Sequence, residues 1–372
     1  MIIAVYAIAK NEERHVERFL HAASEADYVC VLDTGSTDNT VQLLQDGGAI
    51  VSQTIIDPWR FDVARNESLD LIPADTDVCV CLDLDEVLQP GWREILEAAW
   101  TDDTDIGRYT CVSSRNADGS PGTSFLRDKI HQPGKFWWKY PVHEVLVPKD
   151  YWTEIIPVSI PGMIADHLPD HSKDRSGYLK LLELATAELP HDARCAHYLG
   201  REYMYAGRWE DAIRELERHL ELPSAVWYAE RSASLRYIAD CHRALGNNDV
   251  AMRKALHALA ILPKLRENLY ACEKAAYYLE DWRGVVYYGE LAHEADTRTD
   301  SGINEAEAWG AGVYDLLSMG YWHTGKTLAA LGAAVRAQDM CGNNDRERIR
   351  KNIEFFHGEI TKETANDNSG SD

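Results

Sequence analysis

Short hydrophobic runs alternate with amphipathic stretches through the N-terminal part of the chain. A continuous apolar run is typical of a strand buried on both faces, whereas apolar residues at helical spacing predict a helix that covers a sheet. The expected strands span residues 2–9, 28–33, 49–56 and 79–87, and the expected helices span residues 12–26, 37–44 and 61–71. This alternation predicts a parallel sheet with helices on both faces, whose ligands bind at the carboxyl ends of the strands.

The pattern changes twice further along the chain. Between residues 106 and 160, segments rich in aromatic and β-branched residues alternate with Gly and Pro turns and predict antiparallel strands at 108–114, 135–138 and 142–147. After residue 174 the apolar positions take helical spacing. The turn residue Gly207 and the following Ala212 recur as Gly246 and Ala251, a pattern that resembles tetratricopeptide repeats.

These patterns together predict an α/β domain with a Rossmann-like mixed sheet, followed by an all-α, tetratricopeptide-like helical repeat domain. The expected boundaries are 1–172 for the first domain, 173–358 for the second and 359–372 for a disordered tail rich in Asn, Ser and Asp. Two domains are also what a length of 372 residues favours. The repeats are expected to stabilise the protein, to form a homodimer or to present an acceptor.

The run at residues 79–87 ends in two acids, Asp83 and Asp85, two positions apart. On one continuous strand this spacing places both carboxylates on the same face. Two like charges side by side favour a cation between them, and carboxylate oxygens suit a hard divalent ion. The alternative is that these acids only cap the end of a strand. That interpretation accounts poorly for a third acid at Glu86.

Composition narrows the classes of partner. The formal net charge of −23 argues against a broad nucleic-acid surface, although basic residues such as Arg60 and Arg65 are available for a small anionic ligand. The chain has no apolar run of membrane-spanning length and no signal-peptide pattern at its start, so we expect a cytoplasmic protein. The eight cysteines form no CxxC pair, and Cys79 and Cys81 are expected to be reduced and structural.

Four motifs occur in the order seen in family 2 glycosyltransferases. They are Ala7-Ile-Ala-Lys-Asn11-Glu12, Val31-Leu-Asp33-Thr-Gly-Ser-Thr-Asp38, Ala64-Arg65-Asn66 and Leu82-Asp83-Leu-Asp85-Glu86. The chain resembles in particular bacterial and phage members of that family that append tetratricopeptide-like helices. The resemblance implies a GT-A fold, a nucleoside-diphosphate sugar donor that is expected to be UDP-linked, a divalent metal (Mn²⁺ or Mg²⁺) and inversion at the anomeric carbon.

The resemblance also implies roles for single residues. Asp33 would approach the base or ribose, Arg65 would face the nucleotide or diphosphate, Asp83 would contact the ribose and the metal, and Asp85 would hold the metal. The first motif places Ala7, Asn11 and Glu12 on the donor side. Thr34 stands where many relatives carry a second Asp, so the identity of the nucleotide stays open.

An inverting transfer needs a base that takes the proton of the acceptor hydroxyl. Glu144 is the first candidate and Asp166 the second, while His143 is expected to orient the acceptor or the metal. The aromatic residues around Trp137 and Trp138 either hold a sugar ring or belong to the core. His167 is expected as a further metal ligand, with His171 as its competitor.

Two other functions remain open from the residues alone. Asp83 followed by an acid two positions later fits an Asp-nucleophile phosphatase, although that motif normally ends the first strand of its domain. A non-catalytic scaffold with a degenerate sugar-nucleotide domain is the other. For a transferase, a glycan or protein acceptor is favoured over nucleic acid because of the charge.

Overall fold

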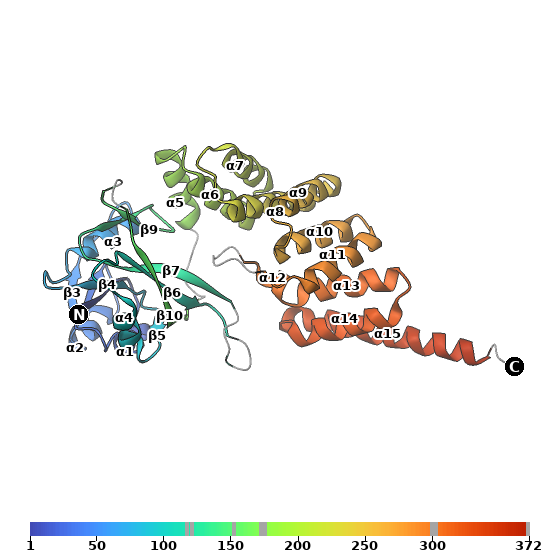
Figure 1. Cartoon of the computed structure of the whole chain (residues 1–372), viewed down its shortest axis with the longest axis horizontal. Helices are drawn as coiled ribbons and strands as arrows, with labels where there is room; N and C mark the ends of the chain where they lie inside the picture. The colour runs from blue at the N-terminus through green and yellow to red at the C-terminus, as the bar shows by residue number, and fades with distance from the viewer. Residues whose placement is uncertain (116–118, 120–122, 151–153, 171–176, 298–303, 370–372) are drawn as a thin grey trace. The chain divides into compact units, whose positions relative to one another are not determined.

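The computed structural model describes residues 1–115, 119, 123–150, 154–170, 177–297 and 304–369 of the chain (Figure 1). It divides into two compact units, the first from Met1 to Ala185 and the second from Thr186 onward. The boundary expected at residues 172 and 173 and the candidate ligand His171 lie outside the described residues.

The first unit contains a mixed eight-stranded sheet in the order β3-β2-β1-β4-β7-β6-β10-β5. Strands β1 to β4 run parallel to one another, whereas β7 runs antiparallel to both β4 and β6. A separate hairpin, β8 with β9, forms a second small sheet. The strands are β1 (Ile3–Ala9), β2 (Tyr28–Asp33), β3 (Ile50–Gln53), β4 (Val78–Cys81), β5 (Glu86–Leu88), β6 (Ile106–Val112), β7 (Ser124–His131), β8 (Phe136–Lys139), β9 (Val145–Pro148) and β10 (Pro157–His167).

Both faces of the central strands are buried, as their continuous apolar sequences predict. One face packs against α1 (Glu13–Ala22), α2 (Thr40–Asp46) and α4 (Trp92–Ala99). The other face, which includes Tyr6, Cys79 and Cys81, packs against Trp138 of β8 and the end of α3 (Phe61–Leu69). The predicted α/β class with a mixed sheet is therefore confirmed. All eight cysteines are free thiols.

The acidic motif does not lie on a strand, and here the expectation from spacing was wrong. Strand β4 ends at Cys81, and a tight turn at 83–86 leads into β5. The amide of Glu86 donates to the carbonyl of Asp83 over 2.9 Å, while the Glu86 carboxylate accepts from the Asp83 amide over 3.1 Å. Because Glu86 is fully buried and closes the turn, Asp83 and Asp85 leave the strand geometry.

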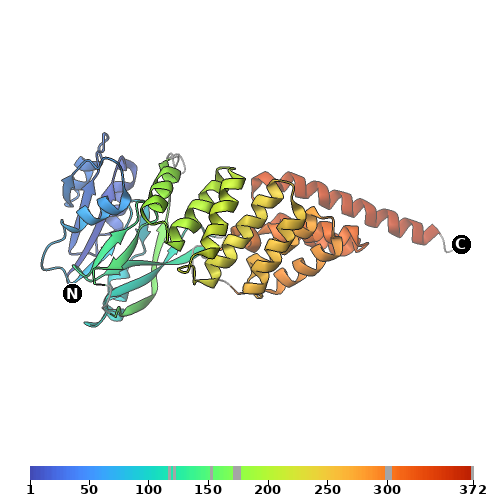
Figure 2. The same ribbon diagram turned by 90° about the horizontal axis from the view of Figure 1, so that it is seen from above.

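The second unit is a series of helical hairpins, which Figures 1 and 2 show as adjacent antiparallel pairs. Its pairs are α6 (Ala193–Tyr205) with α7 (Trp209–Glu221), α8 (Tyr228–Ala244) with α9 (Asn248–Ile261), α10 (Arg266–Tyr278) with α11 (Trp282–Glu294), and α13 (Ala311–His323) with α14 (Thr327–Met340). Helix α5 (Gly177–Glu188), most of which belongs to the first unit, precedes them, and the short α12 (Ala306–Trp309) lies before α13. The helical repeat domain predicted from recurring turn residues is confirmed.

The last helix, α15 (Asn343–Ser369), corrects the expected disordered tail. Helix continues ten residues past Glu359, where the polar composition had suggested disorder. Ile349, Ile353 and Phe356 in its first part pack against the preceding helices. Exposed pairs at helical spacing, such as Arg350–Glu354 and Lys362–Glu359, support the helix further along. Residues 370–372 are outside the described part.

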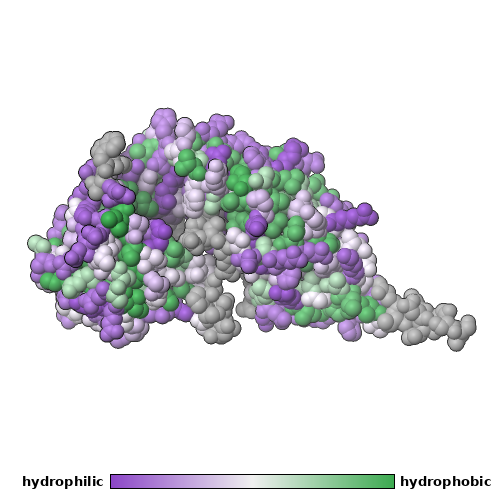
Figure 3. All heavy atoms as spheres, in the orientation of Figure 1, coloured by the Kyte–Doolittle hydropathy of each residue, from purple (hydrophilic) through white to green (hydrophobic). Residues whose placement is uncertain are grey.

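The surface in Figure 3 intersperses hydrophilic and hydrophobic residues over the visible face. Among the helices that the structure describes, none combines the length and the apolar character needed to cross a bilayer.

Candidate active site

Asp83 is the centre of a charged cluster just beyond the carboxyl end of β4. One of its carboxylate oxygens accepts from the Arg65 guanidinium of α3, and the other accepts from the Lys129 ammonium of β7 over 2.6 Å. Burial raises the pKa of Asp83, but the two neighbouring cations outweigh it and hold that pKa well below its ordinary value. Asp83 is thus a fixed anion whose two oxygens are both held by cations of the protein.

Arg65 joins this cluster to Glu144, the residue just before β9. Its side chain is buried, its Nε donates to Glu144 Oε1 over 3.1 Å, and its Nη1 donates to Cys81 Sγ over 3.3 Å. The guanidinium also lies over the Trp138 ring, 5.5 Å from its centroid. Helix α3 therefore brings Arg65, Asp83 and Glu144 together, three residues that the sequence could not relate in space. These contacts make Arg65 a clamp on two carboxylates.

Lys129 is the site residue that sequence reasoning missed. Its amine reaches Glu86 Oε2 over 3.2 Å as well as Asp83, and its side chain is buried. Burial lowers the pKa of Lys129, but the charges of Asp83 and Glu86 outweigh it and raise that pKa above its ordinary value. The sequence shows only a lysine at this position, and the hydrophobic pattern predicts no strand over residues 124–131.

Asp85 and His167 form a second, more accessible pair. Asp85 Oδ2 lies 3.4 Å from His167 Nε2, and the side chains are 28% and 23% exposed. The antiparallel pairing of β10 with β5, which sets His167 opposite Glu86, produces this approach. Burial raises the pKa of Asp85, and the hydrogen bond with His167 outweighs it, so the pKa lies below its ordinary value. Asp85 and His167, which are expected as metal ligands, are far apart in the sequence but lie close together in the structure.

The described residues contain no group of three or more His, Cys, Asp or Glu side chains arranged to hold a metal ion. Asp85 and His167 are an oxygen and a nitrogen donor at one place, which a divalent ion accepts when other ligands complete its shell. Asp83, the third member of the predicted set, is already committed to Arg65 and Lys129. The residues present therefore fit a two-donor site.

Asp33 lies at the carboxyl end of β2, fully buried. Its Oδ1 accepts from the amides of Gly35 and Ser36 over 3.1 and 3.0 Å. Its Oδ2 is buried without a hydrogen-bond partner among the described residues. Such an atom is costly unless something absent from the protein alone satisfies it.

The first motif shapes this loop from the side of β1. Asn11 accepts from the Thr37 amide over 2.7 Å, and the amide of Glu12 donates to Thr40 Oγ1 over 2.7 Å. Ala7 is fully buried inside β1. In the structure, Asn11 and Glu12 brace the loop that follows Asp33, and Ala7 belongs to the core.

Comparison with known families identifies the domain that contains most of these residues. Residues 4–154, which include Asp33, Arg65, Asp83, Asp85, Lys129 and Glu144, match the family described as glycosyl transferase family 2. This part of the chain is a family 2 glycosyltransferase domain. No curated protein matches the chain.

Solved structures resemble the chain over its helical part at low identity. A crystal structure of MamA is 13% identical with a TM-score of 0.36, covering 44% of this chain and 86% of that one. YrrB, titled a TPR protein with an unusual peptide-binding site, is 12% identical with a TM-score of 0.35, covering 46% and 80%. A tetratricopeptide repeat protein from Parabacteroides merdae is 13% identical with a TM-score of 0.36, covering 48% and 63%.

The two candidate bases of the glycosyltransferase domain have different surroundings. Asp166 of β10 is held by both guanidinium nitrogens of Arg115, over 2.7 and 2.8 Å, and by Gln89 over 3.3 Å. Burial raises the pKa of Asp166, but these hydrogen bonds outweigh it and lower the pKa. Glu144, in contrast, is held through Oε1 by Arg65.

The aromatic residues near Glu144 divide between core and surface. Trp138 is 1% exposed and donates from its indole to the Tyr6 hydroxyl over 2.9 Å, so it is a core residue of the domain. Trp137, the next residue, is 39% exposed. His143 has a positive φ of 54° and packs edge-on against Tyr178, with ring centroids 6.1 Å apart. Only Trp137 of this set is open to a ligand.

Proposed function

We propose that the glycosyltransferase domain transfers a sugar from a nucleoside diphosphate to a hydroxyl acceptor, with inversion and with a divalent cation at Asp85 and His167. The observation that carries the proposal is the approach of Asp85 to His167 beside Asp83, which Arg65 and Lys129 hold as an anion. The ends of β2 and β4 lie on one edge of the sheet, where such folds bind nucleotides.

Asp85 and His167 would hold Mn²⁺ or Mg²⁺, which neutralises the charge that builds up on a departing diphosphate. The orphaned Oδ2 of Asp33 supports a donor on the same edge, because a base or ribose donor group would satisfy it. UDP is the simplest candidate nucleotide. Lys129 and Arg65 hold the Asp83 carboxylate in place between Asp33 and the Asp85–His167 pair.

Glu144 is our proposed base. It takes the proton of the acceptor hydroxyl while the oxygen forms its bond to the anomeric carbon. The bond from that carbon to the diphosphate breaks on the opposite face, and its electron pair leaves with the diphosphate. Asp166 suits this role less well, because a carboxylate with both oxygens on Arg115 is a weak proton acceptor.

Asp83 is a poor nucleophile in this environment, which disfavours the phosphatase alternative. Each of its oxygens accepts from a cation, which stabilises the negative charge and weakens both oxygens as nucleophiles toward phosphorus. The scaffold alternative predicts that the chain binds no nucleotide in a metal-dependent way. The calorimetric titration described next tests this alternative too.

Calorimetric titration of the full chain with UDP, GDP and dTDP, each with and without Mn²⁺, tests the proposal. We expect one nucleotide to bind with metal-dependent heat, and we expect Asp85→Asn to weaken this binding by about tenfold or more. The mutant should also lose the slow Mn²⁺-dependent hydrolysis of the matching nucleotide sugar.

Asp128→Asn is the matched control. Asp128 is the residue before Lys129 on β7, is 45% exposed and pairs only at the surface with Arg108 over 2.6 Å. It should bind the nucleotide like the wild type. Undiminished metal-dependent heat in Asp85→Asn, or no heat from any of the three nucleotides, would refute the proposal.

A further inference from the structure

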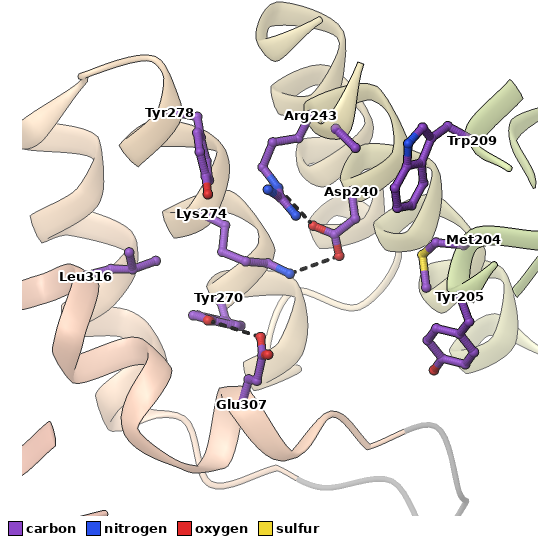
Figure 4. Close-up of a pocket in the computed structure, with 11 residues that line it drawn as sticks. Met204, Tyr205, Trp209, Asp240, Arg243, Tyr270, Lys274, Tyr278, Glu307 and Leu316 are labelled. Atoms are coloured by element: carbon purple, nitrogen blue, oxygen red, sulfur yellow. Dashed lines mark hydrogen bonds and ion pairs between the residues drawn. The ribbon is translucent and has the colours of Figure 1, made fainter. Parts of the chain in front are cut away.

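The second unit contains a cavity of about 500 Å³ that the glycosyltransferase domain does not explain. Helices α6, α8 and α10 contribute most of its walls, and α12 and α13 close one side (Figure 4). The volume lies within the roughly 300–1,000 Å³ of pockets that hold small molecules. All of its lining residues belong to the helical repeats.

Aromatic rings stand open to solvent around this cavity. Tyr205 is 65% exposed, Tyr278 is 47% exposed, and Trp209 is half-buried. Figure 4 shows Tyr278 on one side of the cavity, with Tyr205 and Trp209 on the other. Exposed rings of this size are costly to leave in water and are typical of surfaces that stack on a ligand.

The charged side chains of the cavity neutralise one another. Asp240 accepts from Lys274 over 2.9 Å and from Arg243 over 3.4 Å. Each cation also lies over a tyrosine ring, Lys274 over Tyr270 at 5.1 Å and Arg243 over Tyr278 at 4.8 Å. With Glu307, the two acids of the lining balance its two bases, so the cavity offers no net positive charge to a phosphate or a peptide carboxylate.

The carboxylates nevertheless retain acceptor capacity. An ionised carboxylate offers about four lone-pair positions, and the contacts in the cavity use two at Asp240. Glu307 accepts from the Tyr270 hydroxyl at 3.5 Å, a long and weak contact. The cavity thus combines exposed ring faces with hydrogen-bond acceptors and carries no unbalanced charge.

We propose that this cavity is a subsite for an uncharged carbohydrate, which stacks the C–H face of a sugar ring on Tyr278 and donates hydroxyl hydrogens to Asp240 and Glu307. The proposal rests on the proposed function only in one respect: the bound carbohydrate would be part of the acceptor. A hydroxyl-rich neutral ligand fits ring faces and carboxylates together, whereas a charged peptide end would gain no net attraction from a lining whose acids and bases balance.

Saturation-transfer NMR on the full chain, without nucleotide or metal, tests the subsite apart from the transfer reaction. The probes are maltotetraose, cellotetraose and N,N′,N″,N‴-tetraacetylchitotetraose, together with a blocked Gly-Ser-Thr-Gly peptide. We expect at least one saccharide to receive saturation through its ring protons and Tyr278→Ala to weaken its affinity by about tenfold, the loss usual for an aromatic anchor.

Tyr287→Ala is the matched control, because Tyr287 lies on α11, is 60% exposed and does not line the cavity. It should bind the saccharide like the wild type, and so should Asp85→Asn, whose defect belongs to the donor site. No saturation of any saccharide, an equal loss in Tyr287→Ala, or Tyr278-dependent binding of the peptide alone would overturn the proposal. Saccharide binding with no nucleotide binding would leave the subsite standing and remove the proposed transfer.

Discussion

His131 shows at the scale of one residue how the core beneath the site depends on a protonation state. Its Nδ1 lies 2.9 Å from the carbonyl of Gln132, which can only accept, so Nδ1 carries the hydrogen. Its Nε2 therefore accepts from the Tyr6 hydroxyl over 2.8 Å, and that hydroxyl accepts from Trp138. A protonated imidazole would set a second donor against Tyr6. The hydrogen bonds that connect Trp138, Tyr6 and His131 thus require a neutral histidine.

Acid should destabilise this core. Burial lowers the pKa of His131 from 6.5 to about 4, so its contribution to stability is complete above pH 6.5 and is lost as the pH falls toward 4. Between pH 7 and pH 5 the loss is about 2 kcal/mol. Denaturant unfolding should show His131→Gln losing less stability over this interval by about that amount, whereas the exposed His21→Gln should follow the wild type. Parallel pH profiles for His131→Gln and wild type would contradict this.

At the scale of elements, the four helical hairpins share one turn geometry, which glycine adopts in three of them and Glu280 in the fourth. Gly207 and Gly246 have φ of 72° and 79°, and in the α10–α11 turn Glu280 takes the same left-handed region at 56°. A side chain in this region costs about 1–2 kcal/mol relative to glycine. The third turn of the repeat therefore stores strain that its neighbours avoid.

Substitutions at Glu280 and Gly246 should change the free energy of unfolding in opposite directions. Glu280→Gly relieves the strain, and after the extra flexibility of glycine in the unfolded chain it should stabilise by about 0.5 kcal/mol. Gly246→Ala should destabilise by about 1 kcal/mol, and because a Cβ there would meet no atom within 4 Å, the backbone alone is responsible. Urea unfolding measures both. A loss of stability in Glu280→Gly would show that its side chain contributes more than its strain.

At the scale of the whole molecule, the surplus of acidic residues determines how stability depends on salt. A net charge of −23 repels itself, and salt screens this repulsion over about 10 Å at 0.1 M. Raising NaCl from about 20 to about 200 mM should raise the melting temperature by a few degrees, equivalent to roughly 1 kcal/mol. Potassium chloride should act equally, because the effect is screening. A lower melting temperature would mean that surface ion pairs such as Arg348–Asp315 matter more than the net repulsion.

Local patterns sufficed for the parts of this protein that local physics controls. The strand at 28–33 was predicted with its observed limits, because its apolar run from Tyr28 to Leu32 ends at Asp33 and is followed by turn residues. The hairpin turns followed from recurring glycines. The motifs singled out Asp85 and His167, which lie 3.4 Å apart, and their role as metal ligands stays a prediction.

Tertiary structure decided what depends on contacts between distant elements. Lys129 is an ordinary lysine in the sequence and meets Asp83 only because β7 pairs antiparallel with β4. Arg65 binds Asp83 and Glu144 because α3 packs against β8, and Trp138 is core because its indole reaches Tyr6. The buried Glu86 carboxylate stabilises the turn at Asp83, because it accepts from the Asp83 amide while Lys129 of β7 balances its charge. Periodicity records which residues are buried, whereas the partner of a buried charge is set by which elements the fold brings together.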